Sequence, residues 1–296
     1  MSTSPKSNLR GIAFMVIATC VFSANDVLMK LATDGLPPYE VLFLRGVMAS
    51  LLMFPVILLS GNGRQLKHVV DKWVLVRNMF EFFAVLCFIQ ALANMPIADL
   101  SALGQISPML LLLGVAVIYR EKIGAMRMAL ITLGFVGALL VAQPGLNGFS
   151  VYAVLGLLCS VGTAARDIAG RKVGTNIPAP IVAYATLLLV MVGPGITTFL
   201  FEDWVMPPPR HLLLLAGAGL FLSLGHLFIF MSYRNAAAGA VAPFYYLFSV
   251  WAVLSGLFVF GTFPNQLALV GIGLIVMSGI AVVLLDQRRR RLEVLA

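Results

Sequence analysis

Charged residues are scarce in this chain. Asp, Glu, Lys and Arg make up 11% of its 296 residues, whereas apolar residues make up 60%, and an ordinary soluble domain is about 25% charged. A soluble domain of this length still needs polar side chains to cover its surface. The mean hydropathy of +0.99 therefore excludes an ordinary soluble fold and indicates that lipid surrounds most of the chain.

Cysteine and recognisable enzyme motifs are also in short supply. The three cysteines, Cys20, Cys87 and Cys159, lie inside apolar runs without CxxC spacing, so neither a disulfide framework nor a metal site is predicted, and no cofactor is expected. The motifs HExxH and GxSxG and the Walker lysine loop are missing from the sequence, which argues against an enzyme and against an ATP-driven pump.

The long apolar runs are what the sequence does have. Segments of the length that crosses a bilayer, about 17–25 residues, are separated by turn-forming stretches rich in proline and glycine such as Met206-Pro207-Pro208-Pro209. We expect an all-α polytopic membrane protein with ten transmembrane helices, at 10–31, 39–59, 73–93, 97–119, 124–142, 150–170, 179–201, 210–232, 237–261 and 266–285.

The basic residues near the ends of these segments predict the orientation. If the N-terminus is cytoplasmic, the opposite side keeps only Lys30 and Arg210. This asymmetry fits the positive-inside rule and predicts that both termini are cytoplasmic, in the cell inner membrane. The cytoplasmic segments then hold Lys6, Arg10, Arg64, Lys67, Lys72, Arg77, Arg120, Lys122, Arg127, Arg171, Lys172, Arg234 and Arg288 to Arg291. The net charge of +8 does not form one basic face, so no nucleic-acid partner is expected.

An internal repeat relates the two halves of the chain. An offset of 141 residues aligns Asp26 with Asp167, Pro37 with Pro178, Val41 with Val182, Asn94 with Asn235 and Leu113 with Leu254. Each copy would hold five spans, and because five is odd the second copy enters the membrane upside down. The predicted division is 1–142 for the first repeat, 150–285 for the second and 286–296 for a basic cytoplasmic tail.

This arrangement resembles the drug/metabolite transporter superfamily. The small-residue steps Ile97-Ala98-Asp99-Leu100-Ser101 and Ala238 to Pro243, together with Ser107-Pro108 and the helix end Tyr119-Arg120-Glu121-Lys122, are similar to the EamA-type repeat. The resemblance implies a ten-helix exporter, most similar to exporters of amino acids, aromatic ones included. Nucleotide-sugar and triose-phosphate carriers share the superfamily. The second copy has Thr262 where the first has Glu121.

Polar residues within the spans are costly, so each needs a partner or a role. Asp26 and Lys30 on the first span, and Asp167 and Arg171 on the sixth, are interpreted as i,i+4 pairs in preference to coupling groups for transport. On the third span Arg77 and Glu81 have the same spacing, and two interpretations of Glu81 stay open: a structural ion pair, or a carboxylate that faces a cavity. Arg45 is isolated, and His226 is interpreted as a packing residue in preference to a proton relay.

The fourth and ninth spans are the predicted centre of the site. Ser101, Gln105 and Pro108 share one helix face, and Pro108 removes a helical hydrogen bond in mid-span. Bent spans at matching places in two repeats are the best sequence indication of a transport site. The predicted substrate-binding residues are Asn78, Glu81, Phe82, Ser101, Gln105, Pro108, His226, Tyr245, Tyr246, Ser249 and Trp251; the candidates for coupling are Asp26, Glu81 and Asp167.

The sequence thus predicts a secondary transporter that exports neutral amino acids or related small amphipathic metabolites by alternating access. Its expected partners are that metabolite and the lipid bilayer, and the expected state is a monomer or a weak homodimer. Four alternatives stay open: a carrier of nucleotide sugars or sugar phosphates, a membrane scaffold, a channel, and an intramembrane enzyme that uses Ser223.

Overall fold

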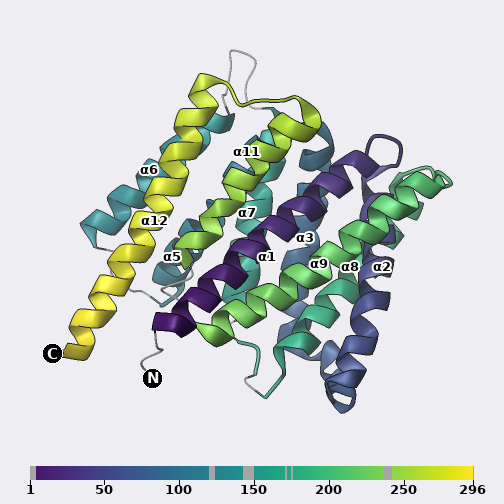
Figure 1. Cartoon of the computed structure of the whole chain (residues 1–296), viewed down its shortest axis with the longest axis horizontal. Coiled ribbons are helices and arrows are strands. Elements are labelled where there is room, and N and C mark those ends of the chain that lie inside the picture. Colours follow the sequence, from purple (N-terminus) through teal and green to yellow (C-terminus); the bar gives the residue numbers. More distant parts are fainter. Residues whose placement is uncertain are drawn as a thin grey trace.

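The computed structural model describes residues 5–119, 124–142, 150–170, 172–174, 176–236 and 242–295. All regular elements within these ranges are helices, which confirms the all-α fold (Figure 1). In chain order they are α1 Pro5–Ala32, α2 Pro38–Leu59, the 3-10 helix η1 Gly63–Val70, α3 Lys72–Asn94, α4 Ile97–Gly104, α5 Ser107–Tyr119, α6 Ala125–Ala142, α7 Val151–Gly170, α8 Ala179–Phe201, α9 Pro209–Asn235, the 3-10 helix η2 Ala242–Tyr246, α11 Leu247–Phe260 and α12 Gln266–Leu295.

Within the described ranges, seven helices are long and apolar enough to cross a membrane, and three shorter apolar helices lie at 97–111, 128–141 and 244–260. The shorter three coincide with the expected fourth, fifth and ninth spans. The chain is therefore a multi-pass membrane protein, while the count of ten spans stays a prediction. The helix α12 continues through the basic segment to Leu295, because arginine and leucine are good helix formers and no breaker follows residue 285.

Helix ends follow local sequence chemistry. Proline occupies the start of α2 and α9, where its missing N–H has no helical partner to lose. The carboxylate of Asp71 caps α3 by accepting from the backbone N–H of Trp73 at 2.9 Å. Gly261 ends α11 with a φ of 63°, a left-handed conformation that glycine adopts without strain.

The helices pack mainly between the two halves of the chain. The most extensive pairings are α1 with α9, α3 with α7, α6 with α12, and α2 with α8. The 141-residue offset relates α1 to α7, α2 to α8, α3 to α9 and α6 to α12. Exchanging the halves therefore turns the pairing of α1 with α9 into that of α7 with α3, and leaves the other two pairings unchanged. An internal two-fold axis would produce this pattern, although the repeat boundaries themselves stay a prediction.

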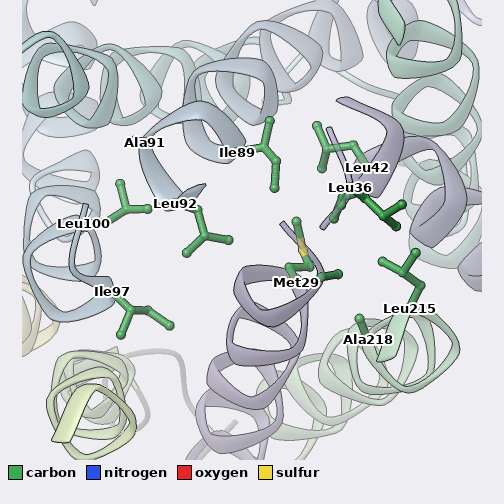
Figure 2. Packing of buried hydrophobic residues seen from close by; sticks show 12 residues of the cluster. Met29, Leu36, Leu42, Ile89, Ala91, Leu92, Ile97, Leu100, Leu215 and Ala218 are labelled. Carbon is green, nitrogen blue, oxygen red and sulfur yellow. The ribbon is translucent and has the colours of Figure 1, made fainter. Parts of the chain in front are cut away.

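The start of α1 and the end of α12 lie at the same end of the bundle (Figure 1), which we call the terminal end. At the opposite, far end, a buried apolar cluster joins α1, α2, α3, α4 and α9; Figure 2 shows Met29, Leu42, Ile89, Leu92 and Leu215 among its members. Met29, Leu42, Ile89, Leu92 and Leu215 are all 0% exposed. This far-end core leaves no solvent-accessible gap among its own side chains.

The expected fourth and ninth spans are both interrupted. A turn over Gln105 and Ile106 separates α4 from α5, directly before the Ser107-Pro108 pair, because proline has no N–H to bond to the carbonyl four residues earlier, at Gly104. In the second half, the 3-10 helix η2 gives way to α11 after Tyr246. Tyr246 is the residue that the 141-residue offset pairs with Gln105, so the two interruptions occupy corresponding positions. Residues 237–241 of the expected ninth span lie outside the described ranges.

Candidate functional site

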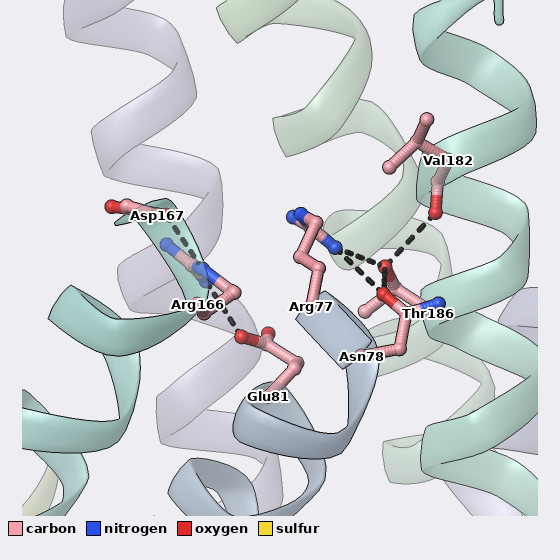
Figure 3. Close-up of polar contacts among 7 residues, drawn as sticks. All are labelled: Arg77, Asn78, Glu81, Arg166, Asp167, Val182 and Thr186. Atoms are coloured by element: carbon pink, nitrogen blue, oxygen red, sulfur yellow. Dashed lines mark hydrogen bonds and ion pairs between the residues drawn. The ribbon is translucent and has the colours of Figure 1, made fainter. Parts of the chain in front are cut away.

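An ion-pair cluster joins the two halves of the chain inside the bundle. Arg166 on α7 donates to Glu81 on α3 at 2.7 Å and to the neighbouring Asp167 at 2.8 Å (Figure 3). Glu81 is the tenth residue of the 23-residue helix α3, about 14 Å along its axis. A charge at such a depth needs a partner, and the second half of the chain supplies it.

The i,i+4 neighbour of Glu81 on α3 forms its hydrogen bonds with other residues. Arg77, one turn away on the same helix, instead donates to Asn78 at 2.8 Å and to the hydroxyl of Thr186 on α8 at 2.7 Å. Thr186 in turn donates to Asn78 at 2.9 Å. Arg77 and Glu81 thus diverge toward different neighbouring helices (Figure 3), because long side chains three to four residues apart can point either way from the helix face.

The predicted pair of Asp26 and Lys30 is wrong. Lys30 donates to the backbone carbonyls of Leu92 at 2.6 Å and Met95 at 2.8 Å, so its charge caps the C-terminus of α3, where the helix dipole is negative. Asp26 accepts instead from the side-chain amide of Asn25 at 2.9 Å. The corresponding pair of the second half cannot be compared, since Arg171 lies outside the described residues, and Asp167 bonds to Arg166.

The two interrupted spans meet through side chains. Gln105 donates from Nε2 to the hydroxyl of Ser249 on α11 at 3.1 Å. Both residues are buried, at 2% and 1% exposure, and the Oε1 atom of Gln105 has no hydrogen-bond partner. Close by, the hydroxyl of Ser160 on α7 donates to the carbonyl of Leu103 at 2.8 Å. The structure therefore brings two predicted residues from opposite halves into contact at the interruptions.

Other predicted site residues are more dispersed. Trp251 donates from its indole nitrogen to Thr19 at 3.2 Å, which links α11 to α1. Tyr246 is buried against Gly279 of α12, whereas the neighbouring Tyr245 is 41% exposed. Ser101 is buried in α4, and the backbone of Pro108 belongs to the first turn of α5.

His226 and Phe82 lie on the helices that flank the ion-pair cluster. The Nδ1 atom of His226 is 2.8 Å from the carbonyl of Leu222, and its imidazole packs edge-on against Phe22. This geometry is that of a packed, hydrogen-bonded histidine. Phe82 follows Glu81 and contacts Gly193 on α8, close to the Gly193-Pro194-Gly195 segment.

Arg45 is the functional candidate whose role the sequence pattern left open. It lies on α2 with 6% of its surface exposed, and its Nε atom has no hydrogen-bond partner. It interacts electrostatically with Asp26 and Glu81, although neither lies within ion-pair distance among the described residues. An isolated arginine in an apolar run was its only sequence signal.

Partial exposure of the cluster indicates access for water. The side chains of Glu81 and Arg166 are 17% and 23% exposed, and that of Asp167 is 38% exposed. Charged atoms at membrane depth face the bundle interior or a water-filled space, because contact with lipid is costly. Arg166 and Asp167 lie in the last turn and a half of α7, so the exposed part of the cluster is nearer to the terminal end of the bundle than to the far end.

A separate apolar groove of about 230 Å³ lies between α5, α6 and α7, lined by residues that include Ile106, Leu110 and Phe135. Its lining offers no polar atom that could orient a solute. Across the described residues, no three His, Cys, Asp or Glu side chains are grouped as metal ligands would be. We therefore consider the polar groups of the ion-pair cluster and of the interrupted spans as the candidates for binding a solute.

The comparisons with known proteins agree with this fold. Residues 9–143 match the EamA-like transporter family, a segment that nearly coincides with the predicted first repeat. One crystal structure of a protein superposes with a TM-score of 0.65 at 19% identity, covering 94% of this chain and 98% of that one, which supports the fold alone.

Three curated relatives cover nearly the whole chain. The pseudopaline exporter of Pseudomonas aeruginosa is 29% identical, covering 92% of this chain and 95% of its own length. The riboflavin transporter of Vibrio cholerae is 27% identical with 96% of both chains covered, and the S-adenosylmethionine uptake transporter of Rickettsia conorii is 24% identical with 97% of both covered. Residues 9–143 thus match the EamA-like transporter family, and the chain is similar over its length to membrane transporters, which confirms its resemblance to the drug/metabolite transporter superfamily.

Proposed function

We propose that this chain is a secondary transporter that exports neutral amino acids, aromatic ones included, and related small amphipathic metabolites across the inner membrane by alternating access. The observation that carries the proposal is the pair of interrupted spans at corresponding positions, joined by the Gln105 to Ser249 hydrogen bond of 3.1 Å. Interrupted helices expose backbone groups and allow the two halves to move against each other around a central site.

The neighbouring groups suit such a substrate. Gln105, Asn78 and the ion-pair cluster offer hydrogen bonds to a polar end, while Phe82 and Trp251 offer aromatic surface for an apolar side chain. The far-end core packs α1, α2, α3, α4 and α9 together, whereas the side chains of the ion-pair cluster are partly exposed. A transporter that works by alternating access needs such a difference between the two ends of its bundle.

The three relatives differ in the substrate and direction that their names give, from an exporter to an uptake transporter. Export of amino acids by this chain is therefore a proposal about its own site. The runner-up is a carrier of larger metabolites such as nucleotide sugars. An enzyme is disfavoured because Ser223 donates to the carbonyl of Gly219 at 2.9 Å and His226 Nδ1 contacts its own helix, so the two form no nucleophile–base pair.

Flux measurements with purified protein in proteoliposomes test the proposal. The panel contains radiolabelled tryptophan, threonine, methionine, riboflavin, S-adenosylmethionine and a sugar phosphate. We expect saturable tryptophan or methionine flux that Gln105→Leu reduces about fivefold to thirtyfold, since the loss of a buried hydrogen bond costs about 1–2 kcal/mol. Gln266→Leu, at an exposed position, is the matched control and should leave flux unchanged. Amino-acid flux no greater than that of empty vesicles would reject the proposal.

The proposed orientation, with both termini in the cytoplasm, has its own test. A single cysteine at Leu66, on η1 at the terminal end, should resist a membrane-impermeant maleimide in intact cells and react once the membrane is opened. Ile123, which the predicted topology also places in the cytoplasm, lies outside the described residues. Labelling of the position-66 cysteine in intact cells would invert the topology.

A further inference from the structure

One carboxylate inside the bundle lies among three arginines and one histidine, which come from four helices. Glu81 on α3 interacts electrostatically with Arg166 on α7, with Arg77 on its own helix and with His226 on α9. Arg45 on α2 interacts electrostatically with Glu81 as well. Two of these helices come from each half of the chain, so Glu81 lies where the halves converge.

The guanidinium groups around Glu81 have more donors than the described acceptors satisfy. Arg166 holds both nearby carboxylates, Glu81 at 2.7 Å and Asp167 at 2.8 Å. Arg77 is bonded to uncharged oxygens, those of Asn78 and Thr186 (Figure 3). Among the described residues, neither Arg77 nor Arg45 has a carboxylate within ion-pair distance.

Two buried donors, one on α2 and one on α3, are unpartnered. The Nε atom of Arg45 and the Nδ2 atom of Asn78 lack a hydrogen-bond partner, and the two residues are only 6% and 1% exposed. Buried donors in native proteins are almost always satisfied, and a guanidinium in a membrane span is among the costliest to leave unmet. A purely structural network built around Glu81 would be expected to use these donors.

We propose that the substrate supplies the missing acceptor of Arg45: its carboxylate binds to this buried guanidinium. A planar carboxylate matches the paired N–H groups of a guanidinium. The substrates of this site are therefore small amphipathic molecules with a free carboxylate, and molecules that lack one are excluded by the cost of leaving Arg45 unpaired. This inference rests on the proposed function and specifies the substrate class of the same site.

Competition against radiolabelled tryptophan in proteoliposomes of the wild-type protein tests the carboxylate requirement without any variant. Indole-3-propionate keeps the carboxylate and lacks the amine, whereas tryptamine and tryptophan amide lack the carboxylate. We expect indole-3-propionate to inhibit within about threefold of unlabelled tryptophan, and the other two to inhibit at least about tenfold more weakly, the loss of one charge-assisted hydrogen bond. Inhibition by tryptamine or tryptophan amide as strong as by tryptophan would overturn the inference.

Variants assign the requirement to Arg45. Arg45→Gln should raise the inhibition constant of indole-3-propionate at least about tenfold and abolish its advantage over tryptamine, while Arg45→Lys keeps part of that advantage. Arg64→Gln removes the same charge from the exposed face of η1 and should change neither constant. An Arg45→Gln protein that folds and retains the full advantage would also overturn the assignment.

Ligand-induced thermal stabilisation separates this inference from the proposed function. If tryptophan is not transported but indole-3-propionate raises the Tm of the wild type and not that of Arg45→Gln, the carboxylate site stands and amino-acid transport falls. If tryptophan is transported and its amide competes equally well, transport stands and the carboxylate site falls. If Arg45→Gln cannot be purified folded, the wild-type series and Arg45→Lys still decide.

Discussion

The bond between Arg166 and Glu81 should contribute measurably to holding the two halves of the chain together. Replacing Glu81 with Gln leaves Arg166 bonded to Asp167 at 2.8 Å, so the loss is one charge-assisted hydrogen bond, about 1.5–3 kcal/mol. Replacing Arg166 with Gln removes the ion-pair partner of both Glu81 and Asp167. Breaking a fully buried pair costs about 3–5 kcal/mol, and the 17–23% exposure of this pair lowers our expectation to about 2–4 kcal/mol.

A double-mutant cycle isolates the interaction from these separate losses. When Glu81→Gln is already present, Arg166→Gln no longer leaves the Glu81 carboxylate without a partner. The double variant should therefore lose less stability than the sum of the two single losses, by about 1.5–3 kcal/mol. The free energy of unfolding is measured by denaturant titration in mixed micelles, with helix content and Trp fluorescence as two independent probes.

The control cycle pairs Glu81→Gln with Arg64→Gln on the exposed face of η1, where the effects should add within about 0.5 kcal/mol. A coupling energy for Glu81 and Arg166 as small as that of the control would refute the claim that this contact binds the halves together. A larger loss from Glu81→Gln than from Arg166→Gln would refute the order of the single effects.

The remaining predictions concern helix crossings and the far end of the bundle. Gly271→Ala should destabilise the protein by about 1–3 kcal/mol, because the added Cβ would lie 2.5 Å from the carbonyl of Gly137. The same change at Gly273, where nothing lies within 4 Å, should be neutral or slightly stabilising. Equal effects of the two variants in thermal unfolding would contradict this account. Lys30→Met should lower the free energy of unfolding by about 1–3 kcal/mol, since two carbonyls at the end of α3 lose their donor; an unchanged value would show that water replaces the ammonium without cost. Burial raises the pKa of Glu202 above its ordinary value of 4.5, so the folded state binds this proton more tightly and stability should fall as the pH rises from 4.5 through the raised pKa. Glu202→Gln should flatten that slope in unfolding measured between about pH 4 and about pH 7, and an unaltered slope would assign it to another group.

The membrane-spanning helices and the interruption of two of them could be predicted from sequence alone. Apolar runs separated by proline and glycine predict helices because backbone groups in lipid must be satisfied within the segment. Pro108 predicts the first interruption, since its ring and missing N–H act on its own helix. The 141-residue offset then pairs Gln105 with Tyr246, the matching position in the second half. Local chemistry and comparison of the chain with itself are enough for both steps.

The partners of the charged residues were decided only by tertiary packing. Spacing along one helix suggested Lys30 for Asp26, which is wrong, and it left the role of Glu81 open. The partner of Glu81 is Arg166, 85 residues away, and it becomes a neighbour only because α3 packs against α7. Spacing on one helix shows which side chains can reach each other. Inside a membrane, however, a long charged side chain can also bond to a donor or acceptor on a neighbouring helix. Only the arrangement of the helices decides which of these groups becomes its partner.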